Sequence, residues 1–226
     1  MPVAIKFCGL TRARDAERAV ALGASYLGVI FAGGPRHLDA QRARAVLAPS
    51  SGTTVARVGV FSRQAPDEIA RTAEQAGLMI IQMHGDPSAE HVLDVRRLTG
   101  AAVWGVARIA GAELPPGHAE LFKAADGVVL DSRVVGALGG SGTTFDWLGV
   151  RDEIRAAADK RLLILAGGLT PENVEEGIRA LRPAVVDVSS GVEARIGEKD
   201  HARMAAFVQA ARRQSTNELG EHAGSD

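Results

Sequence analysis

Short apolar segments recur at fairly regular intervals along the chain, and a helical pattern follows each of them. Such runs, each about as long as a strand, indicate parallel β-strands joined by crossover helices. Eight units of this kind within 226 residues fit a closed (β/α)8 barrel, a single-domain α/β fold (TIM barrel) near the short end of its usual size. The eight expected strands span residues 3–8, 26–31, 55–61, 79–83, 102–107, 127–131, 162–166 and 184–188.

An open, doubly wound sheet is the alternative architecture for the same alternation. The first predicted turn, over residues 8–13, lacks the Gly-x-Gly-x-x-Gly pattern with which such sheets bind dinucleotides, and this favours the barrel. No low-complexity segment or linker divides the chain. We therefore expect one catalytic domain over residues 1–213. Residues 214–226 are polar, with almost no apolar side chains to bury, so we expect a disordered C-terminal tail.

Composition narrows the possible partners. The formal net charge is -1, and the 26 lysines and arginines are spread along the chain, so we expect no nucleic-acid binding. The single cysteine excludes an internal disulfide, and the six histidines are dispersed, so we expect no metal, and chemistry without a cofactor is the simpler proposal. The start of the chain lacks a signal-peptide pattern, and no apolar run approaches the roughly 18 residues of a membrane span. We expect a cytoplasmic protein with no membrane association.

The carboxyl ends of the strands are where a (β/α)8 barrel builds its active site, so polar residues there have most weight. Cys8 ends the first predicted strand and, by pleat parity, projects to the same side as Lys6. Asp131 ends the sixth strand on the face of Gly127, a small residue that suits a crowded barrel interior. A thiol and a carboxyl on opposite sides of the barrel mouth are a candidate acid and base pair. The alternative for Asp131 is a helix or turn cap.

The loops after the seventh and eighth predicted strands are rich in glycine and serine. This fold commonly binds phosphate with these two loops, through backbone N–H groups and the N-terminus of a short helix. The pattern predicts a phosphorylated small-molecule substrate, with ordinary tight turns as the alternative. The candidate phosphate-binding residues are Gly167, Gly168, Ser189, Ser190 and Gly191.

Other polar residues at strand ends are candidate substrate contacts. Arg36 follows the second strand and could bind a carboxylate through its planar guanidinium, or be an ordinary solvated arginine. His84 follows the fourth strand as a candidate base or, preferably, a hydrogen-bonding partner of the substrate. Gln82 and Asp187 lie at the ends of the fourth and eighth strands. The glycine-rich segment 136–142 follows the sixth strand and could close over bound substrate.

Several of these motifs occur in a fixed order over nearly the whole chain. A Gly-Gly or a Ser-Ser-Gly alone is weak evidence, but the cysteine motif, the Gly-Gly-Ser-Gly to Phe-Asp-Trp block and the Asp-Val-Ser-Ser-Gly-Val-Glu block together are specific. The segments are 6–11, 58–61, 82–85, 130–131, 139–147, 167–174 and 186–193. Taken together, they resemble the phosphoribosylanthranilate isomerase family.

The resemblance implies a (β/α)8 barrel that converts N-(5'-phosphoribosyl)anthranilate into 1-(2-carboxyphenylamino)-1-deoxyribulose 5-phosphate by an Amadori rearrangement in tryptophan biosynthesis, without a cofactor. By position, Cys8 matches the family's general base, Asp131 its general acid, and Arg36 the arginine that contacts the anthranilate carboxylate. Asp131 then needs a raised pKa, because it must start protonated. Cys8 needs a lowered pKa, to which the positive charge of Lys6 would contribute.

Two other functions and the state of assembly are left open. A dual-substrate phosphosugar isomerase that also serves histidine biosynthesis is expected to use paired aspartates, and Cys8 argues against it. A non-catalytic phosphate-binding barrel would not need both Cys8 and Asp131. A chain of this size could be a monomer or a homodimer.

Overall fold

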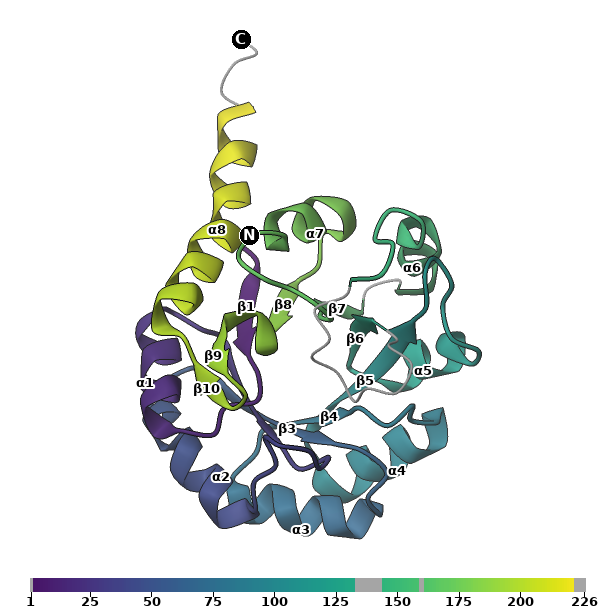
Figure 1. The fold of residues 1–226 in the computed structure, drawn as a ribbon. Coiled ribbons are helices and arrows are strands. Elements are labelled where there is room, and N and C mark those ends of the chain that lie inside the picture. Colours follow the sequence, from purple (N-terminus) through teal and green to yellow (C-terminus); the bar gives the residue numbers. More distant parts are fainter. Residues whose placement is uncertain (1, 133–143, 159–160, 222–226) are drawn as a thin grey trace.

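The computed structural model describes residues 2–132, 144–158 and 161–221, with side chains up to residue 213. Eight parallel strands close into a barrel in sequence order, and β1 pairs with β8 to complete the ring (Figure 1). The (β/α)8 barrel expected from the sequence is therefore confirmed. The strands are β1 (Ala4–Phe7), β2 (Tyr26–Ile30), β3 (Ala56–Phe61), β4 (Ile80–Met83), β5 (Ala102–Ile109), β6 (Gly127–Ser132), β7 (Leu162–Leu165) and β8 (Val185–Val188).

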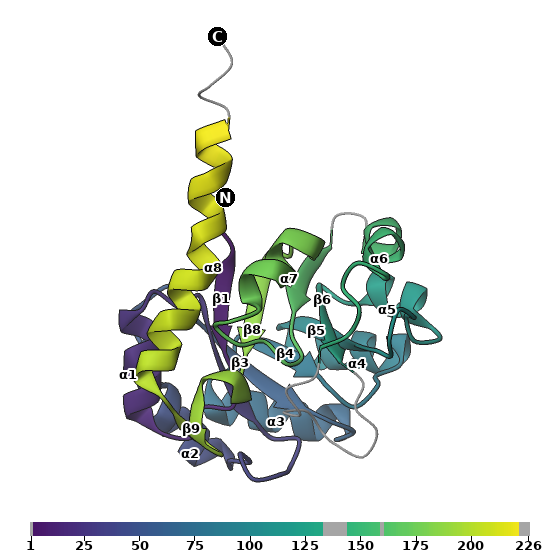
Figure 2. The same cartoon turned by 45° about the horizontal axis from the view of Figure 1, so that its top comes forward.

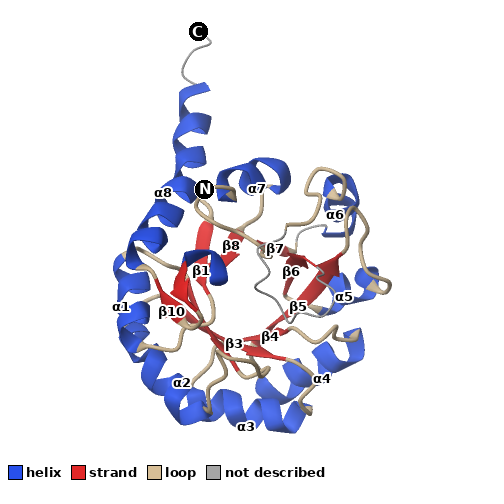
Figure 3. Ribbon diagram, in the orientation of Figure 1, coloured by secondary structure: helices blue, strands red, loops and turns tan. Residues whose placement is uncertain are grey.

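Helices form a ring around the outside of the strands (Figure 3). Two short 3-10 helices and a small antiparallel hairpin interrupt the alternation. The helices are α1 (Ala13–Ala21), α2 (Ala40–Leu47), α3 (Pro66–Ala76), α4 (Ala89–Thr99), α5 (His118–Ala124), α6 (Arg151–Ala158), α7 (Val174–Leu181) and α8 (His201–Glu221). The other elements are η1 (Ala48–Ser50), η2 (Ser190–Val192) and the hairpin strands β9 (Glu193–Arg195) and β10 (Glu198–Lys199).

Local sequence fixes where several of these helices begin and end. The Asp39 carboxylate accepts a hydrogen bond from the backbone N–H of Arg42 at the start of α2. The Ser88 hydroxyl does the same for the N–H of His91 in α4. Both side chains satisfy an amide that the first helical turn leaves unpaired. Helix α4 ends at Gly100, whose φ of 63° is the left-handed conformation that glycine adopts without strain.

Alternate residues of each strand face two different cores. On β1, Ile5 and Phe7 pack outward against the helices, whereas Lys6 lies on the opposite face and is fully buried inside the barrel. On β6, Val128 and Leu130 likewise belong to the outer core. This arrangement confirms the pleat parity that places Lys6 and Cys8 on one face, and Asp131 with the inward residues of its strand.

The barrel interior is apolar at its lower end, where the strands begin, and polar near its mouth, where the strands end. Tyr26 and Trp104 meet edge to face with ring centroids 5.1 Å apart and fill the lower end. A side chain at Gly127 would approach Trp104 Cδ1 to 2.8 Å, so the strand needs glycine there. The polar residues that are buried near the mouth are Lys6, Gln82, Asp131 and Asp187. Polar groups at the carboxyl ends of barrel strands are where this fold performs its chemistry.

The C-terminal helix differs from the sequence-based expectation of a disordered tail from residue 214. The backbone of α8 is helical to Glu221, and this helix projects beyond the barrel in both views (Figures 1 and 2). Its first turns are anchored by buried Met204 and Phe207, and extending a nucleated helix fixes only one residue for each hydrogen bond gained. Residues 222–226 lie outside the described part, and the domain boundary at 213 stays a prediction. No helix in the described ranges is both long and apolar enough to cross a membrane.

Candidate active site

A cavity of about 500 Å³ opens at the carboxyl ends of the strands. It brings together residues from almost every predicted strand end, and Gly191 alone of the predicted site residues is not part of its lining. Separate strands supply the thiol and the carboxyl of the predicted acid and base pair. The predicted site residues that line the cavity are Cys8, Arg36, Gln82, His84, Asp131, Gly167, Gly168, Asp187, Ser189 and Ser190.

Cys8 follows β1 directly and lies beside a buried ion pair. Its backbone N–H donates to the carbonyl of Val188, which ties the end of β1 to β8. Two residues earlier, the Lys6 ammonium donates to Asp187 Oδ2 at 2.6 Å. Lys6 and Asp187 are register partners in the parallel pair of β1 and β8, so their side chains project to the same face. The geometry places a positive charge and its counterion next to the thiol.

Burial has the largest effect on the pKa of Cys8. Loss of solvation raises the pKa of the thiol, and the nearby Asp187 carboxylate raises it further. The Lys6 ammonium acts in the opposite direction but does not outweigh these effects. The expectation of a lowered Cys8 pKa is therefore wrong, because burial destabilises the thiolate more than a lysine that also pairs with Asp187 stabilises it. The pKa of Lys6 is raised by Asp187 and Cys8, against its own desolvation.

The pKa of Asp131 is shifted in the direction expected of a carboxyl that must start protonated. Burial, followed by repulsion from Asp187, raises the pKa of Asp131 to about 6. Its neighbour His84 lies with Nε2 3.8 Å from Asp131 Oδ2, and burial lowers the pKa of His84 to about 4. His84 is therefore neutral at pH 7. Because a pKa of about 4 makes His84 a weak base, a hydrogen-bonding role fits it better than a role as general base.

The raised pKa of Asp131 predicts how the stability of the protein depends on pH. The folded value of about 6 exceeds the ordinary 3.8, so the folded state binds more protons between these values and stability falls as pH rises through this window. Asp131→Asn removes the free-energy cost of ionising this buried carboxyl. We expect the variant to unfold with a free energy up to about 3 kcal/mol above wild type at pH 8, and near wild type at pH 4.

Urea unfolding at both pH values measures this difference. The exposed carboxyl Asp67, which pairs with Arg71 at 2.7 Å, supplies the control. Asp67→Asn should show no such gain at pH 8, because arginine lowers the pKa of that carboxyl. Equal stability differences for Asp131→Asn at both pH values would contradict the raised pKa.

Two further oxygens near the mouth are buried without a hydrogen-bond partner among the described residues. They are Gln82 Oε1 and Asp187 Oδ1. Both residues line the cavity, and each is less than a tenth exposed. A buried acceptor without a partner costs free energy, which a donor on a ligand would recover. Hydroxyl groups of a sugar are suitable donors.

The two predicted phosphate loops lie next to each other. Gly167 and Gly168 follow β7 with φ of 78° and 67°, and Ser189 and Ser190 lead into η2. A side chain at Gly167 would come within 2.6 Å of Asp131 Oδ1, so glycine lets this loop approach the carboxyl. A side chain at Gly191 would collide with the carbonyl oxygen of Leu169. Gly191 thus has a packing role between the two loops, and its contact with phosphate stays a prediction.

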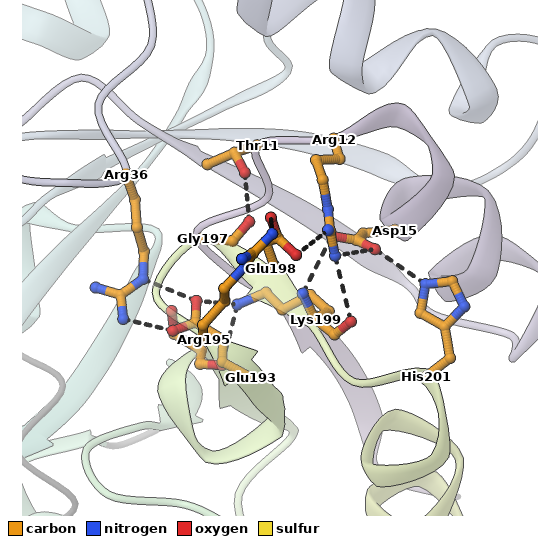
Figure 4. A network of polar contacts seen from close by, with 11 residues as sticks. Thr11, Arg12, Asp15, Arg36, Glu193, Arg195, Gly197, Glu198, Lys199 and His201 are labelled. Atoms are coloured by element: carbon orange, nitrogen blue, oxygen red, sulfur yellow. Dashed lines mark hydrogen bonds and ion pairs between the residues drawn. The ribbon is translucent and has the colours of Figure 1, made fainter.

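Arg36 is held by an ion pair with Glu193, and its side chain is 15% exposed. Its Nε donates to Glu193 Oε1 at 2.8 Å and its Nη2 to Glu193 Oε2 at 2.6 Å (Figure 4). Lys199 Nζ donates to the same carboxylate at 3.0 Å and to the carbonyl of Ser189 at 3.0 Å. Glu193 and Lys199 were not among the residues predicted for the site. Glu193 ends the Asp-Val-Ser-Ser-Gly-Val-Glu block, and a charge this close to the eighth strand end was the available signal.

Two further expectations concern a metal site and a closing loop. No group of three or more histidine, cysteine, aspartate or glutamate side chains is placed to hold a metal in the described ranges. The glycine-rich segment 136–142, which the sequence suggests as a closing loop, lies outside the described residues.

Known proteins are similar to this chain both in sequence and in fold. The family model for N-(5'phosphoribosyl)anthranilate (PRA) isomerase matches residues 5–210. The curated N-(5'-phosphoribosyl)anthranilate isomerase of Ralstonia pickettii is 40% identical over 217 residues, which cover 92% of each chain.

Solved structures agree with this sequence match. The crystal structure of phosphoribosyl anthranilate isomerase from Thermus thermophilus superposes with a TM-score of 0.80 at 35% identity, and the match covers 92% of this chain and 98% of that one. A phosphoribosyl anthranilate isomerase in complex with reduced 1-(o-carboxyphenylamino)-1-deoxyribulose 5-phosphate superposes with a TM-score of 0.78 at 30% identity and the same coverage. The similarity thus extends over nearly the whole barrel.

Proposed function

Because the chain belongs to the N-(5'-phosphoribosyl)anthranilate isomerase family, we propose that Cys8 and Asp131 perform the family's reaction at the mouth of this barrel. The protein is an isomerase of tryptophan biosynthesis. Its reaction is an intramolecular aldose to ketose conversion, an Amadori rearrangement. N-(5'-phosphoribosyl)anthranilate becomes 1-(2-carboxyphenylamino)-1-deoxyribulose 5-phosphate, whose reduced form is the ligand in the related complex.

Asp131 acts first, as the general acid. Its carboxyl proton passes to the furanose ring oxygen as the bond from that oxygen to C1 breaks, and the nitrogen lone pair forms the C1–N double bond of a protonated Schiff base. Only the protonated carboxyl can do this, and the pKa of about 6 keeps more of the carboxyl protonated near neutral pH than the ordinary value of 3.8 would. The raised pKa of a buried carboxyl on the cavity wall is the observation that carries the proposal.

Cys8 acts second, as the general base. Its thiolate takes the proton from C2, and the C2–H electron pair forms a C1–C2 double bond while the C1–N π electrons return to nitrogen. The resulting enolamine tautomerises to the ketone, with a proton added at C1 and the C2 hydroxyl proton lost. Lys6 supports this step, because an ammonium beside the thiol stabilises the thiolate.

Anchors at the two ends of the substrate would hold C1 and C2 between acid and base. We assign the phosphate to the loops of Gly167, Gly168, Ser189 and Ser190, and the anthranilate carboxylate to Arg36. Gln82, His84 and Asp187 would contact the sugar, whose hydroxyls suit the unpaired oxygens of Gln82 and Asp187. The scheme uses no metal or organic cofactor. Fixing both ends supplies the positioning on which catalysis without a cofactor depends.

The first test is turnover. Purified protein is mixed with N-(5'-phosphoribosyl)anthranilate generated in situ, and the loss of its anthranilate-type fluorescence is followed. Wild type should convert the substrate without added metal and in the presence of a chelator. Absence of turnover would reject the proposed chemistry for this chain.

Arg36→Met should act mainly on substrate binding. A charge-assisted pair with a carboxylate is lost, which corresponds to a rise in KM of about 10- to 100-fold with a much smaller change in kcat. Steady-state kinetics measure the split. An unchanged KM would reject the assignment of the anthranilate carboxylate to Arg36.

Location and assembly belong to the same proposal. A pathway enzyme that acts on a phosphorylated intermediate is expected in the cytoplasm, where such intermediates are made and retained. The protein could be a monomer or a homodimer, and light scattering at assay concentration distinguishes the two.

A further inference from the structure

Among the described residues, the contacts of the Arg36 guanidinium use only one of its edges. The Nε and Nη2 groups donate to the two oxygens of Glu193, a side-on bidentate pair. Arginine has five N–H donors in a planar fork, so the Nη1 group and the second hydrogen of Nη2 form another edge. In Figure 4 the Nη1 group points away from Glu193 and from the rest of the network. A second carboxylate can therefore bind Arg36 while Glu193 stays in place.

Glu193 is itself fixed in position. Its side chain is 5% exposed, and Lys199, whose side chain is fully buried, donates to it and to the carbonyl of Ser189. The backbone N–H of Lys199 donates to Asp15 Oδ2 at 3.2 Å. Arg36 and Lys199 lower the pKa of Glu193 despite its burial, so this carboxylate is ionised at neutral pH. A rigid anion thus lies between two cations.

The hairpin that carries this cluster is also anchored to the start of α1. The Thr11 hydroxyl donates to the carbonyl of Gly197, and Arg12 pairs with Glu198 at 2.5 Å (Figure 4). At the tip of the hairpin, Ile196 is 64% exposed and lines the cavity, as Arg36 and Glu193 do. An apolar side chain and a cation at one rim suit an aromatic ring that carries an acidic group.

We propose that Glu193 is a positioning residue for substrate selection. Lys199 holds the Glu193 carboxylate, which binds one edge of the Arg36 guanidinium and thereby directs the other edge toward the carboxylate of the ligand. The inference rests on the proposed function, in which Arg36 binds that carboxylate. Without Glu193, Arg36 loses both hydrogen bonds and faces the like charge of Lys199. The site then keeps its positive charge but loses the fixed direction that distinguishes a carboxylated ring from a plain one.

The experiment compares two ligands. One is reduced 1-(2-carboxyphenylamino)-1-deoxyribulose 5-phosphate, and the other is its counterpart with an unsubstituted phenyl ring. Calorimetry gives both dissociation constants, and their ratio measures selectivity for the carboxylate. A residue that only supports the fold would weaken both ligands alike. A residue that positions Arg36 changes the ratio and leaves the phenyl ligand nearly unaffected.

Wild type should favour the carboxylated ligand, and Arg36→Met should bring the ratio close to one. Glu193→Gln, which keeps the side-chain volume, should lower the ratio by about tenfold, as expected for loss of an oriented charged hydrogen bond. The double variant Arg36→Met with Glu193→Gln should match Arg36→Met, because Glu193 acts through Arg36. Glu198→Gln is the matched control, since it removes a carboxylate from the same hairpin that pairs with Arg12 and Arg195 instead.

Arg36→Lys gives a second test that leaves the pair of Glu193 and Lys199 intact. A lysine keeps the charge but has no second planar edge, so its ratio should also fall by about tenfold. A wild-type ratio in Arg36→Lys would overturn the inference, and so would an unchanged or increased ratio in Glu193→Gln. If Arg36→Met itself keeps the wild-type ratio, the assignment of Arg36 in the proposed function fails, and this inference fails with it.

Discussion

Cys8→Ala is expected to lower kcat by about 10²- to 10⁴-fold while KM changes little, because alanine removes the base and none of the binding groups. The residual activity should not recover at high pH, since no thiol is left to ionise. The side chain is small and 7% exposed, so the fold should persist. Steady-state kinetics with the fluorescent substrate measure the loss, and circular dichroism checks the fold.

Cys8→Ser separates basicity from shape. A serine hydroxyl occupies nearly the same space but does not ionise near neutral pH, so this variant should be as impaired as Cys8→Ala. A free thiol is also open to direct titration. Because burial raises its pKa, Cys8 should react slowly with a thiol reagent at pH 7 and faster as the pH rises. A kcat within tenfold of wild type in either variant would remove Cys8 from the mechanism.

Asp131→Asn is expected to lose a similar factor of about 10²- to 10⁴-fold in kcat, because the amide cannot give a proton to the ring oxygen. Asp126→Asn is the matched control. Asp126 precedes the same strand at the opposite end of the barrel, where it pairs with Arg96 at 2.9 Å. Near-normal turnover in Asp131→Asn, measured alongside this control, would exclude Asp131 as the general acid.

The pH dependence of kcat/KM gives the same pair a kinetic signature. The productive state holds one proton, on Asp131 and not on Cys8, although the pKa values favour the opposite distribution. Both one-proton forms disappear below the lower pKa, so kcat/KM should fall below about pH 6 and again above the raised pKa of the thiol. The acid limb should be absent in Asp131→Asn. The second ionisation of a phosphate ester also lies near pH 6, and a limb that persists in Asp131→Asn would belong to the substrate.

Asp131 also illustrates why activity and stability oppose each other at such a site. The pKa of about 6 that makes the carboxyl a proton donor is produced by burial that destabilises its ionised form. The same substitution that removes the acid should therefore stabilise the fold at pH 8. This combination of lost turnover and gained stability is not expected for a residue that only caps a turn.

The strands were predictable because their signal is local. All eight expected segments overlap observed strands, and β5 is the main difference, since it continues two residues past the expected 107 to Ile109. The alternation along β1 also predicted which side Cys8 and Lys6 share. Because active sites of this fold lie at the carboxyl ends of the strands, the sequence also predicted that Cys8 and Asp131 share one cavity.

The features that the sequence did not reveal depend on contacts between distant segments. The sign of the Cys8 pKa shift depends on how much burial outweighs Lys6, and Lys6 shares its charge with Asp187, 181 positions away. The pairing of Arg36 with Glu193 spans 157 positions. The helical backbone of α8 beyond residue 213 follows from nucleation on the barrel, which the polar composition of the tail does not reveal.

The sequence by itself determined the architecture, the residues that reach the mouth of the barrel and the chemical types available there, because periodicity and strand ends are properties of neighbouring residues. The tertiary structure decided how those groups are charged and aimed. In the folded protein the thiol and the carboxyl are buried, the Lys6 ammonium interacts with both Cys8 and Asp187, and Glu193 pairs with Arg36. Ionisation and orientation depend on desolvation and on through-space charge, and only the folded chain fixes both.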